Sequence, residues 1–371
     1  MKKIGLCMIV KDEAHVIERC LDSLKILLDY VLIVDTGSTD DTISIIRNWL
    51  IINNLPGEVI EENWKNFAYN RSFALTKLQE IEVDYSIMID ADEVLIFDAN
   101  FNISDFKNSL SEEIYDITTN MGGFTYTRPT LTSNKRKYRY EGVVHEFLAM
   151  DETSTRGKVV GFYNKPIQDS NRNKDPNKFL NDALLLEEAL KTETGEWLVS
   201  RYTFYLAQCY KDSGKLELAL ENYLKRSEQG FWNEEVFISL YSAGNLMKIL
   251  NYDKSIILQT WMNAYEILPY RAESLWAILQ YCRTHGLNNQ GYIIGKVAKD
   301  IIYPENSLFV EGWVYDYGIL DEFSILAFWS GHYSESKESC DRLLEENKIP
   351  EYYLERVKSN LQFSLDRLGI V

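Results

Sequence analysis

Residues 30–42 read YVLIVDTGSTDDT, an apolar run that ends in an aspartate and a turn. An uninterrupted apolar run of this length is typical of a strand buried on both faces of a parallel sheet. Gly37 permits a tight turn and the close approach of a ligand, and the polar residues after it can cap a following helix. The segment therefore predicts a strand, a turn and a helix, with Asp35 at the carboxyl end of the strand.

The same alternation surrounds this segment. Three further apolar runs are predicted strands: residues 4–10, 59–62 and 85–89. Two segments have the apolar spacing of helices: residues 13–28 and 66–78. Repeated strand–helix–strand units predict an α/β fold with a parallel, doubly wound sheet. Ligands of such sheets bind beyond the carboxyl ends of the strands, so Asp12, Asp35 and Asp90 should share that edge.

The pattern changes twice further along the chain. Residues 122–161 are rich in β-formers and turns, which predicts an antiparallel or mixed extension of the sheet through residues 123–128, 138–141 and 159–163. Residues 168–177 are polar and are predicted to be a linker. We therefore expect two domains, residues 1–170 and residues 171–371.

The second domain should be all-α. Ala207, Tyr210, Gly214, Ala219 and Tyr223 have the small and large spacing of a tetratricopeptide helical hairpin. The alanines let two helices approach, the tyrosines fill the flanking holes, and the glycine allows the turn. A weaker copy begins at Ser324. These patterns predict about three to five hairpins that stack into a short solenoid.

Composition limits the classes of function. The 371 residues include 39 Lys and Arg against 56 Asp and Glu, a net charge of −17, which argues against a nucleic-acid partner. Five cysteines without a CxxC pair suggest reduced thiols. The N-terminal apolar run is broken at Lys11, too early for a signal peptide, and no window of about 18 apolar residues suggests a membrane span. We expect a cytoplasmic protein, with a peripheral position at the inner face of a membrane left open.

Residues 87–93, IMIDADE, place two carboxylates just after a predicted buried strand. Asp90 and Asp92 flank one residue, so in an extended segment they lie on the same side. Together they could hold a hard divalent cation, which would neutralise a diphosphate leaving group. The alternative is an ordinary aspartate-rich turn at the end of a strand.

Taken together, the segments VKDEA (residues 10–14), VDTGSTDDT (34–42) and IDADE (89–93) resemble the family-2 glycosyltransferases, whose nucleotide-sugar-binding fold is called GT-A. The helix with Trp64, Phe67, Asn70 and Arg71, and the segment YEGVVHE (140–146), are similar to one subgroup of that family. This subgroup often carries tetratricopeptide repeats behind the transferase domain. The resemblance covers about residues 1–165.

The resemblance implies roles for particular residues. It assigns the nucleoside of the nucleotide-sugar donor to Val10, Lys11 and Glu13. The base would contact Asp35, with Gly37 beside it. The donor phosphates would contact Arg71, and the ribose or a metal would contact Asp90. Asp92 would bind the metal, Mn²⁺ or Mg²⁺, and His145 is a further metal ligand.

The catalytic assignment is left open between several acids. Glu146, together with Asp92, is the first candidate for the catalytic machinery, either as the base or as a group that positions its neighbours. Glu93, Glu141 and Asp151 are rivals for the base.

The family resemblance implies an inverting, metal-dependent transfer of a sugar from a nucleotide-diphosphate donor, for which a UDP-sugar is expected. The acceptor would be a glycan, a peptide or protein, or a lipid-linked molecule, and the repeats could hold it, self-associate or bind a protein partner. One alternative is a non-catalytic nucleotide-binding scaffold. Another is a nucleotidyltransferase, but residues 10–15 lack the glycine-rich loop with a basic residue that such enzymes carry.

Overall fold

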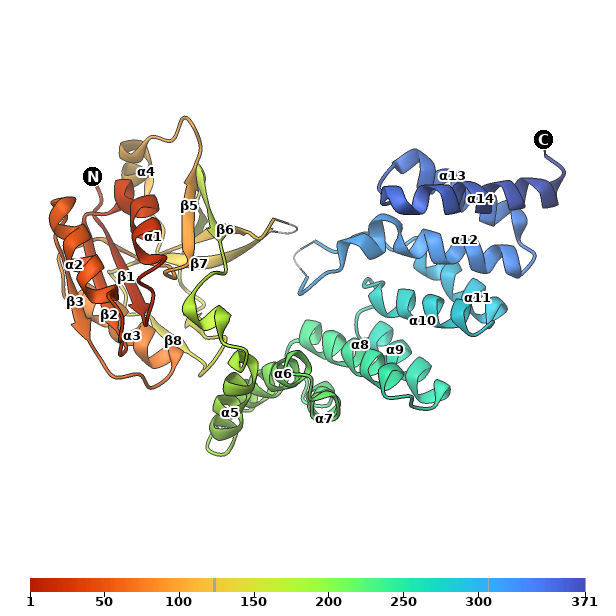
Figure 1. Cartoon of the computed structure of the whole chain (residues 1–371), viewed down its shortest axis with the longest axis horizontal. Coiled ribbons are helices and arrows are strands. Elements are labelled where there is room, and N and C mark those ends of the chain that lie inside the picture. Colours follow the sequence, from red (N-terminus) through yellow and green to blue (C-terminus); the bar gives the residue numbers. More distant parts are fainter. Residues whose placement is uncertain (123–124, 306, 371) are drawn as a thin grey trace. The chain divides into compact units, whose positions relative to one another are not determined.

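The computed structural model describes residues 1–122, 125–305 and 307–370. Contacts divide the chain into two compact units, Met1–Thr192 and Glu193–Val371 (Figure 1). The predicted linker and helix α5 (Lys178–Leu190) thus group with the first unit. The boundary between the two units, after Thr192, therefore lies later in the chain than the predicted domain boundary at 170/171.

The first unit is built on a mixed sheet whose first half is parallel, as predicted. Its four parallel strands are β1 (Ile4–Val10), β2 (Tyr30–Asp35), β3 (Gly57–Glu61) and β4 (Tyr85–Met88). Their spatial order is β3-β2-β1-β4, so β1 lies between β2 and β4. The carboxyl ends of β1, β2 and β4 therefore meet at one edge.

Helices cover both faces of these strands. Residues of β1 alternate between the faces: Leu6 and Met8 share a core with α1 (Ile17–Leu24) and α2 (Thr42–Ile52). Cys7 belongs to the opposite core, with Ala74 of α3 (Phe67–Gln79). The doubly wound arrangement predicted from the sequence is confirmed.

The second half of the sheet is mixed, as expected, but the strand predicted at 138–141 belongs to a separate two-stranded sheet. Strand β7 (Thr125–Ser133) runs antiparallel to β4 and to β6 (Ile114–Asn120). The remaining elements are β5 (Glu93–Phe97), α4 (Ile103–Ser109), β10 (Arg156–Lys158), β11 (Phe162–Pro166) and the separate pair β8 (Arg139–Glu141) and β9 (Phe147–Ala149). Of the predicted strand at 123–128, residues 123 and 124 lie outside the described residues.

The first predicted helix is shorter than expected. It was predicted over residues 13–28, but α1 begins at Ile17 and gives way to a 3₁₀ turn at Lys25–Leu27. Asp12 has a left-handed φ of 56°, and the backbone N–H of Glu13 donates to Thr42 Oγ1 at 2.8 Å. These two features bend residues 12–13 toward the turn after β2, so the helix cannot start there.

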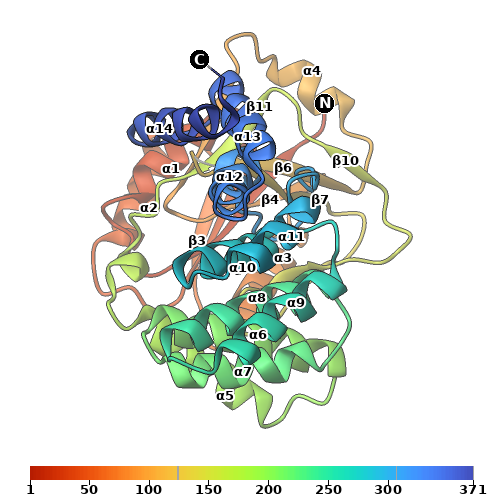
Figure 2. The same ribbon diagram turned by 90° about the vertical axis from the view of Figure 1, so that its right-hand side faces the viewer.

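The second unit is a stack of helices. They are α6 (Glu196–Asp212), α7 (Leu216–Ser227), α8 (Asn233–Ile249), α9 (Lys254–Ile267), α10 (Glu273–Thr284), α11 (Asn288–Ala298), α12 (Ile319–Trp329), α13 (Tyr333–Glu346) and α14 (Glu351–Leu368). Within the described residues, α6–α13 form four successive packed pairs that α14 closes (Figure 2). In the first pair Ala207 and Ala219 are fully buried and Gly214 turns with a φ of 75°, as the repeat pattern predicts.

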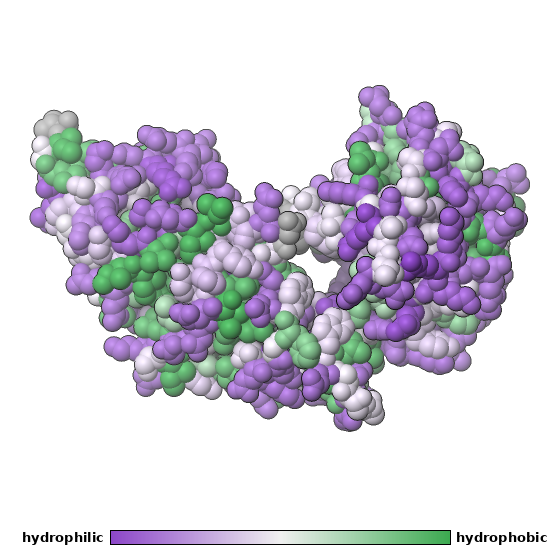
Figure 3. All heavy atoms as spheres, turned by 180° about the vertical axis from the view of Figure 1, so that it is seen from behind, coloured by the Kyte–Doolittle hydropathy of each residue, from purple (hydrophilic) through white to green (hydrophobic). Residues whose placement is uncertain are grey.

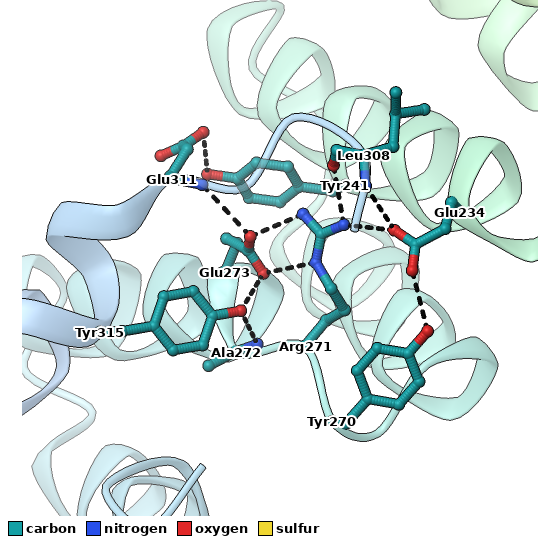
Figure 4. A network of polar contacts seen from close by, with 9 residues as sticks. All are labelled: Glu234, Tyr241, Tyr270, Arg271, Ala272, Glu273, Leu308, Glu311 and Tyr315. Carbon is teal, nitrogen blue, oxygen red and sulfur yellow. Dashed lines mark hydrogen bonds and ion pairs between the residues drawn. The ribbon is translucent and has the colours of Figure 1, made fainter. Parts of the chain in front are cut away.

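A buried ion network braces the middle of this stack (Figure 4). The guanidinium of Arg271, which is fully buried, lies 2.6 Å from Glu234 on α8 and 2.6 Å from Glu273 on α10. It also donates to the carbonyl of Leu308 at 2.8 Å, and Tyr315 donates to Glu273 at 2.7 Å. The network thus holds the segment before α12 against α8 and α10.

The helices and one face of the molecule bear on whether the chain has a segment that could span a membrane. On the face in Figure 3, hydrophilic residues predominate and hydrophobic residues form patches between them. Among the described residues, no helix is long and apolar enough to cross a bilayer. All five cysteines are buried and lie outside any disulfide, in agreement with the expectation of reduced thiols.

Candidate active site

A pocket of about 590 Å³ opens at the edge where β1, β2 and β4 end. Its walls come from the residues that follow these strands, from the start of α3, from the segment before α5 and from α5 itself. Val10, Lys11, Glu13, Arg71, Asp90 and Asp92, six of the predicted site residues, line it. Asp35, Gly37, His145 and Glu146 do not.

The loops after β1 and β2 are tied to each other. The backbone N–H of Asp12 donates to Ser38 Oγ at 2.8 Å, and that of Thr39 donates to Asp12 Oδ1 at 2.6 Å. Together with the bond from Glu13 to Thr42, these contacts fix one wall of the pocket.

Asp35 builds the turn beside the pocket. Its Oδ2 accepts the backbone N–H groups of Gly37 and Ser38, both at 2.9 Å, and Gly37 adopts a φ of 107° that favours glycine. The side chain is buried, and its Oδ1 has no hydrogen-bond partner among the described residues. The next residue, Thr36, lines the pocket in its place.

Arg71 lies between two carboxylates. Its Nη2 is 2.6 Å from Asp90 Oδ1 and its Nε is 2.5 Å from Glu146 Oε1. Burial disfavours the charge on Arg71, but the two acids outweigh it and raise its pKa well above the usual value. Burial likewise opposes the charge on Asp90, yet Arg71 lowers the pKa of that carboxyl. The pocket therefore keeps a permanent cation with an ionised aspartate beside it.

Residues 169–174, which we call the strap, contact two further acids of the pocket, Asp92 and Glu13. Asp92 Oδ2 accepts the backbone N–H of Ser170 at 3.3 Å and the side-chain amide of Asn173 at 3.1 Å. The backbone N–H of Asn171 donates to Glu13 at 3.4 Å. Burial, and to a lesser extent the charge of Asp92, raises the pKa of Glu13 to about 7.

The ends of the strap are also fixed. Asp169 pairs with Arg19 at 2.7 Å, and Lys174 Nζ lies 2.6 Å from His15 Nε2. Within the strap, Arg172 contacts both carboxylate oxygens of Asp182 on α5 at 2.6 Å and lies 4.5 Å from the centre of the Phe67 ring. Arg172 is thereby a second arginine in the wall of the pocket.

The predicted metal trio is not assembled. Among the residues that the structure describes, no group of three or more His, Cys, Asp and Glu side chains is placed to hold a metal ion. Asp90 and Asp92 share the pocket, but His145 has a left-handed φ of 52° and is not in its wall. The assignment of Asp90, Asp92 and His145 to a metal therefore stays a prediction, and of the three only Asp90 and Asp92 lie in the pocket wall.

The strap is the part of the site that the sequence did not reveal. We predicted residues 168–177 to be a linker because they are polar and lack periodicity. Ser170, Asn171, Arg172 and Asn173 all line the pocket, and so do Asp182 and Leu185 of α5. The one local signal was an arginine among short amide side chains directly after the last strand.

Comparison with known proteins gives the family of the first unit. Residues 6–100 match the model of Glycosyl transferase family 2. The first unit contains a family 2 glycosyltransferase domain. The matched residues include the ends of β1, β2 and β4, and so most of the predicted donor residues.

Several relatives and solved structures are similar to parts of this chain. An uncharacterized glycosyltransferase of Rickettsia felis is 28% identical over 64% of this chain and 79% of its own length. A TPR repeat-containing protein of Synechococcus elongatus is 29% identical over 40% of this chain and 36% of its own. The crystal structure of S. aureus TarS 1–349 in complex with UDP covers 71% of this chain and 90% of its own at 12% identity, with a TM-score of 0.34. A tetratricopeptide repeat protein from Parabacteroides merdae covers 52% and 69% at 16% identity, with a TM-score of 0.38.

Proposed function

We propose that the glycosyltransferase domain binds a nucleotide-diphosphate sugar in the pocket at the carboxyl edge of β1, β2 and β4. There it transfers the sugar, with inversion, to a glycan, a protein or a lipid-linked acceptor. The observation that carries the proposal is the convergence of Arg71, Asp90 and Asp92 on one pocket of this domain. Arginine and carboxylates in one cleft are what a diphosphate and its counter-ion require.

The nucleoside is assigned to the wall made by Val10, Lys11 and Glu13. Asp35 and Gly37 would shape the neighbouring turn, with Thr36 as the residue of that turn in the pocket. A protonated Glu13 could donate a hydrogen bond to a carbonyl of the base, and a UDP-sugar is the donor that we expect.

The diphosphate is assigned to Arg71 and Arg172. Both line the pocket, and a guanidinium can bind two phosphate oxygens at once. Asp90 and Asp92 fit a Mg²⁺ or Mn²⁺ ion, because Mg²⁺ is usually bound by one or two carboxylates together with substrate phosphates and water. Such an ion would neutralise charge on the departing diphosphate.

Glu146 was expected either as the base or as a positioning group. Its contact with Arg71 at 2.5 Å supports the second role, because it fixes the direction of the guanidinium. The base that deprotonates the acceptor stays open among the other acids that we considered. The attack itself would come from the face of the sugar opposite the diphosphate, which inverts the anomeric carbon.

The test is release of nucleoside diphosphate from a panel of nucleotide sugars, with and without Mn²⁺ or Mg²⁺, in the wild type and in Asp92→Asn. We expect donor hydrolysis with one nucleotide and a drop of at least 100-fold in Asp92→Asn. Asp105→Asn, at an exposed aspartate in the first turn of α4 and outside this pocket, is the matched control and should keep full activity.

Three results would count against the proposal. Retention of activity in Asp92→Asn would exclude the assignment of this carboxylate. A folded wild-type sample that binds a nucleotide sugar and cleaves none would favour the non-catalytic scaffold, and a sample that binds none would refute the donor site.

A further inference from the structure

The helical unit has a pocket of its own. It measures about 490 Å³, within the usual range of small-molecule sites, and lies wholly inside residues 193–371. Its walls come from α10, α12, α14 and the π-helical turn Val314–Gly318. We call it the aromatic pocket.

Four aromatic rings form a continuous row along this pocket. The ring centres of Trp276 and Trp313 are 4.6 Å apart and nearly perpendicular, and Tyr317 follows at 5.9 Å from Trp313. Tyr353 continues the row at 6.3 Å from Tyr317. All four side chains are partly exposed rather than buried, so the row presents apolar ring surface to a ligand.

The backbone is adapted to these rings. A Cβ atom on Gly318 would lie 2.8 Å from the Trp313 ring and 3.3 Å from Trp276 Nε1, so the rings can approach the chain only at a glycine. The π-helical turn that ends at Gly318 interrupts the regular helix at the same point. Single π-helical turns of this kind are frequent at functional sites.

The charged groups of the pocket wall are paired with one another. Arg283 contacts the carboxylate of Glu322 at 2.5 and 3.0 Å, and Arg356 contacts Asp321 Oδ2 at 2.7 Å. Two arginines therefore balance two acids, and no lining charge is left to neutralise an ionic ligand. The second oxygen of Asp321 accepts no hydrogen bond within the described part of the chain.

We propose that the aromatic pocket binds a neutral carbohydrate. A sugar ring presents an apolar C–H face, which stacks on tryptophan and tyrosine, and a rim of hydroxyls that both donate and accept hydrogen bonds. Adjacent arginine and carboxylate groups supply hydrogen-bond donors and acceptors for these hydroxyls.

This site is separate from the donor pocket, whose residues all belong to the first unit. Carbohydrate binding here does not depend on the proposed transferase activity. The interpretation that this pocket retains a glycan acceptor rests on the proposed function.

The experiment uses the full chain and three neutral trisaccharides, maltotriose, cellotriose and N,N′,N″-triacetylchitotriose, with a tyrosine-containing tripeptide as the competing class. Binding is followed by saturation-transfer NMR and calorimetry. We expect at least one trisaccharide to bind and its dissociation constant to rise at least tenfold in Trp276→Ala. Trp329→Ala, at an exposed tryptophan of α12 outside the pocket, is the matched control and should bind like the wild type.

Tyr353→Leu removes a second, partly exposed ring and gives an independent variant if Trp276→Ala fails to fold. Binding of none of the trisaccharides, binding that survives in both pocket variants, or binding of the tripeptide alone would overturn the proposal. Release of nucleoside diphosphate is measured in the same samples. Trisaccharide binding without that release would refute the transferase and leave this inference standing.

Discussion

At the scale of single residues, we expect Glu13 to make the proposed donor pocket sensitive to pH. Its pKa of about 7 means that the side chain is largely neutral at pH 6 and largely ionised at pH 8. Ionisation adds a negative charge to the pocket that we propose for a diphosphate. Two negative charges about 10 Å apart repel each other by ~1.7 kcal/mol at an effective dielectric constant of about 20. A repulsion of this size lowers the affinity for the diphosphate more than tenfold. We expect nucleoside diphosphate to bind at least several-fold more weakly at pH 8 than at pH 6.

Glu13→Gln is the matched variant, because it keeps the shape and stays neutral. Its affinity should change little between the two pH values, and an equal pH dependence in both proteins would refute the assignment.

The same raised pKa affects stability. Between the usual pKa of 4.5 and about 7 the folded chain binds more protons at Glu13 than the unfolded chain does. The contribution of this residue to the free energy of unfolding therefore falls as pH rises through that window.

At the scale of elements, the strands and the helical repeat could be predicted from the sequence because each has a regular residue pattern. The buried strands β1, β2 and β4 were recognised by their apolar runs, and the aspartates after them by their place at the carboxyl edge. The repeat was recognised from Ala207, Ala219 and Gly214. The strap was not, because its role depends on bonds to Asp92, Glu13 and Arg19, which are remote in sequence, and no local pattern specifies them.

The Arg271 network makes a prediction for the repeat helices. Arg271→Met would leave Glu234 and Glu273 buried without their cation, and breaking a buried pair in this way typically costs about 3–5 kcal/mol. The control is Arg342→Met on α13, where the arginine is half exposed and pairs with Glu346 within its own helix. That change should cost no more than about 0.5 kcal/mol. Equal shifts of the two variants in a thermal unfolding experiment would contradict the structural role of the network.

At the scale of the whole molecule, the division into units can be tested through the donor site. A fragment of residues 1–192 keeps α5, whereas a fragment of residues 1–177 lacks it and with it Asp182, the partner of Arg172. Loss of a charge-assisted pair of this kind is worth about 1.5–3 kcal/mol. We therefore expect the shorter fragment to bind nucleoside diphosphate at least tenfold more weakly, measured by calorimetry after both fragments have been shown to unfold cooperatively.

Asp182→Asn in the longer fragment separates the carboxylate from the helix that carries it. If the carboxylate holds Arg172 in place, this single change should reproduce most of the loss seen on removing α5. If instead the 1–177 fragment binds as tightly as 1–192, then α5 contributes nothing to the donor site and the transferase domain ends nearer to the predicted boundary at 170/171. The strap would then suffice to close the pocket, since its remaining bonds to Arg19, Asp92 and Glu13 are all made by residues before position 178.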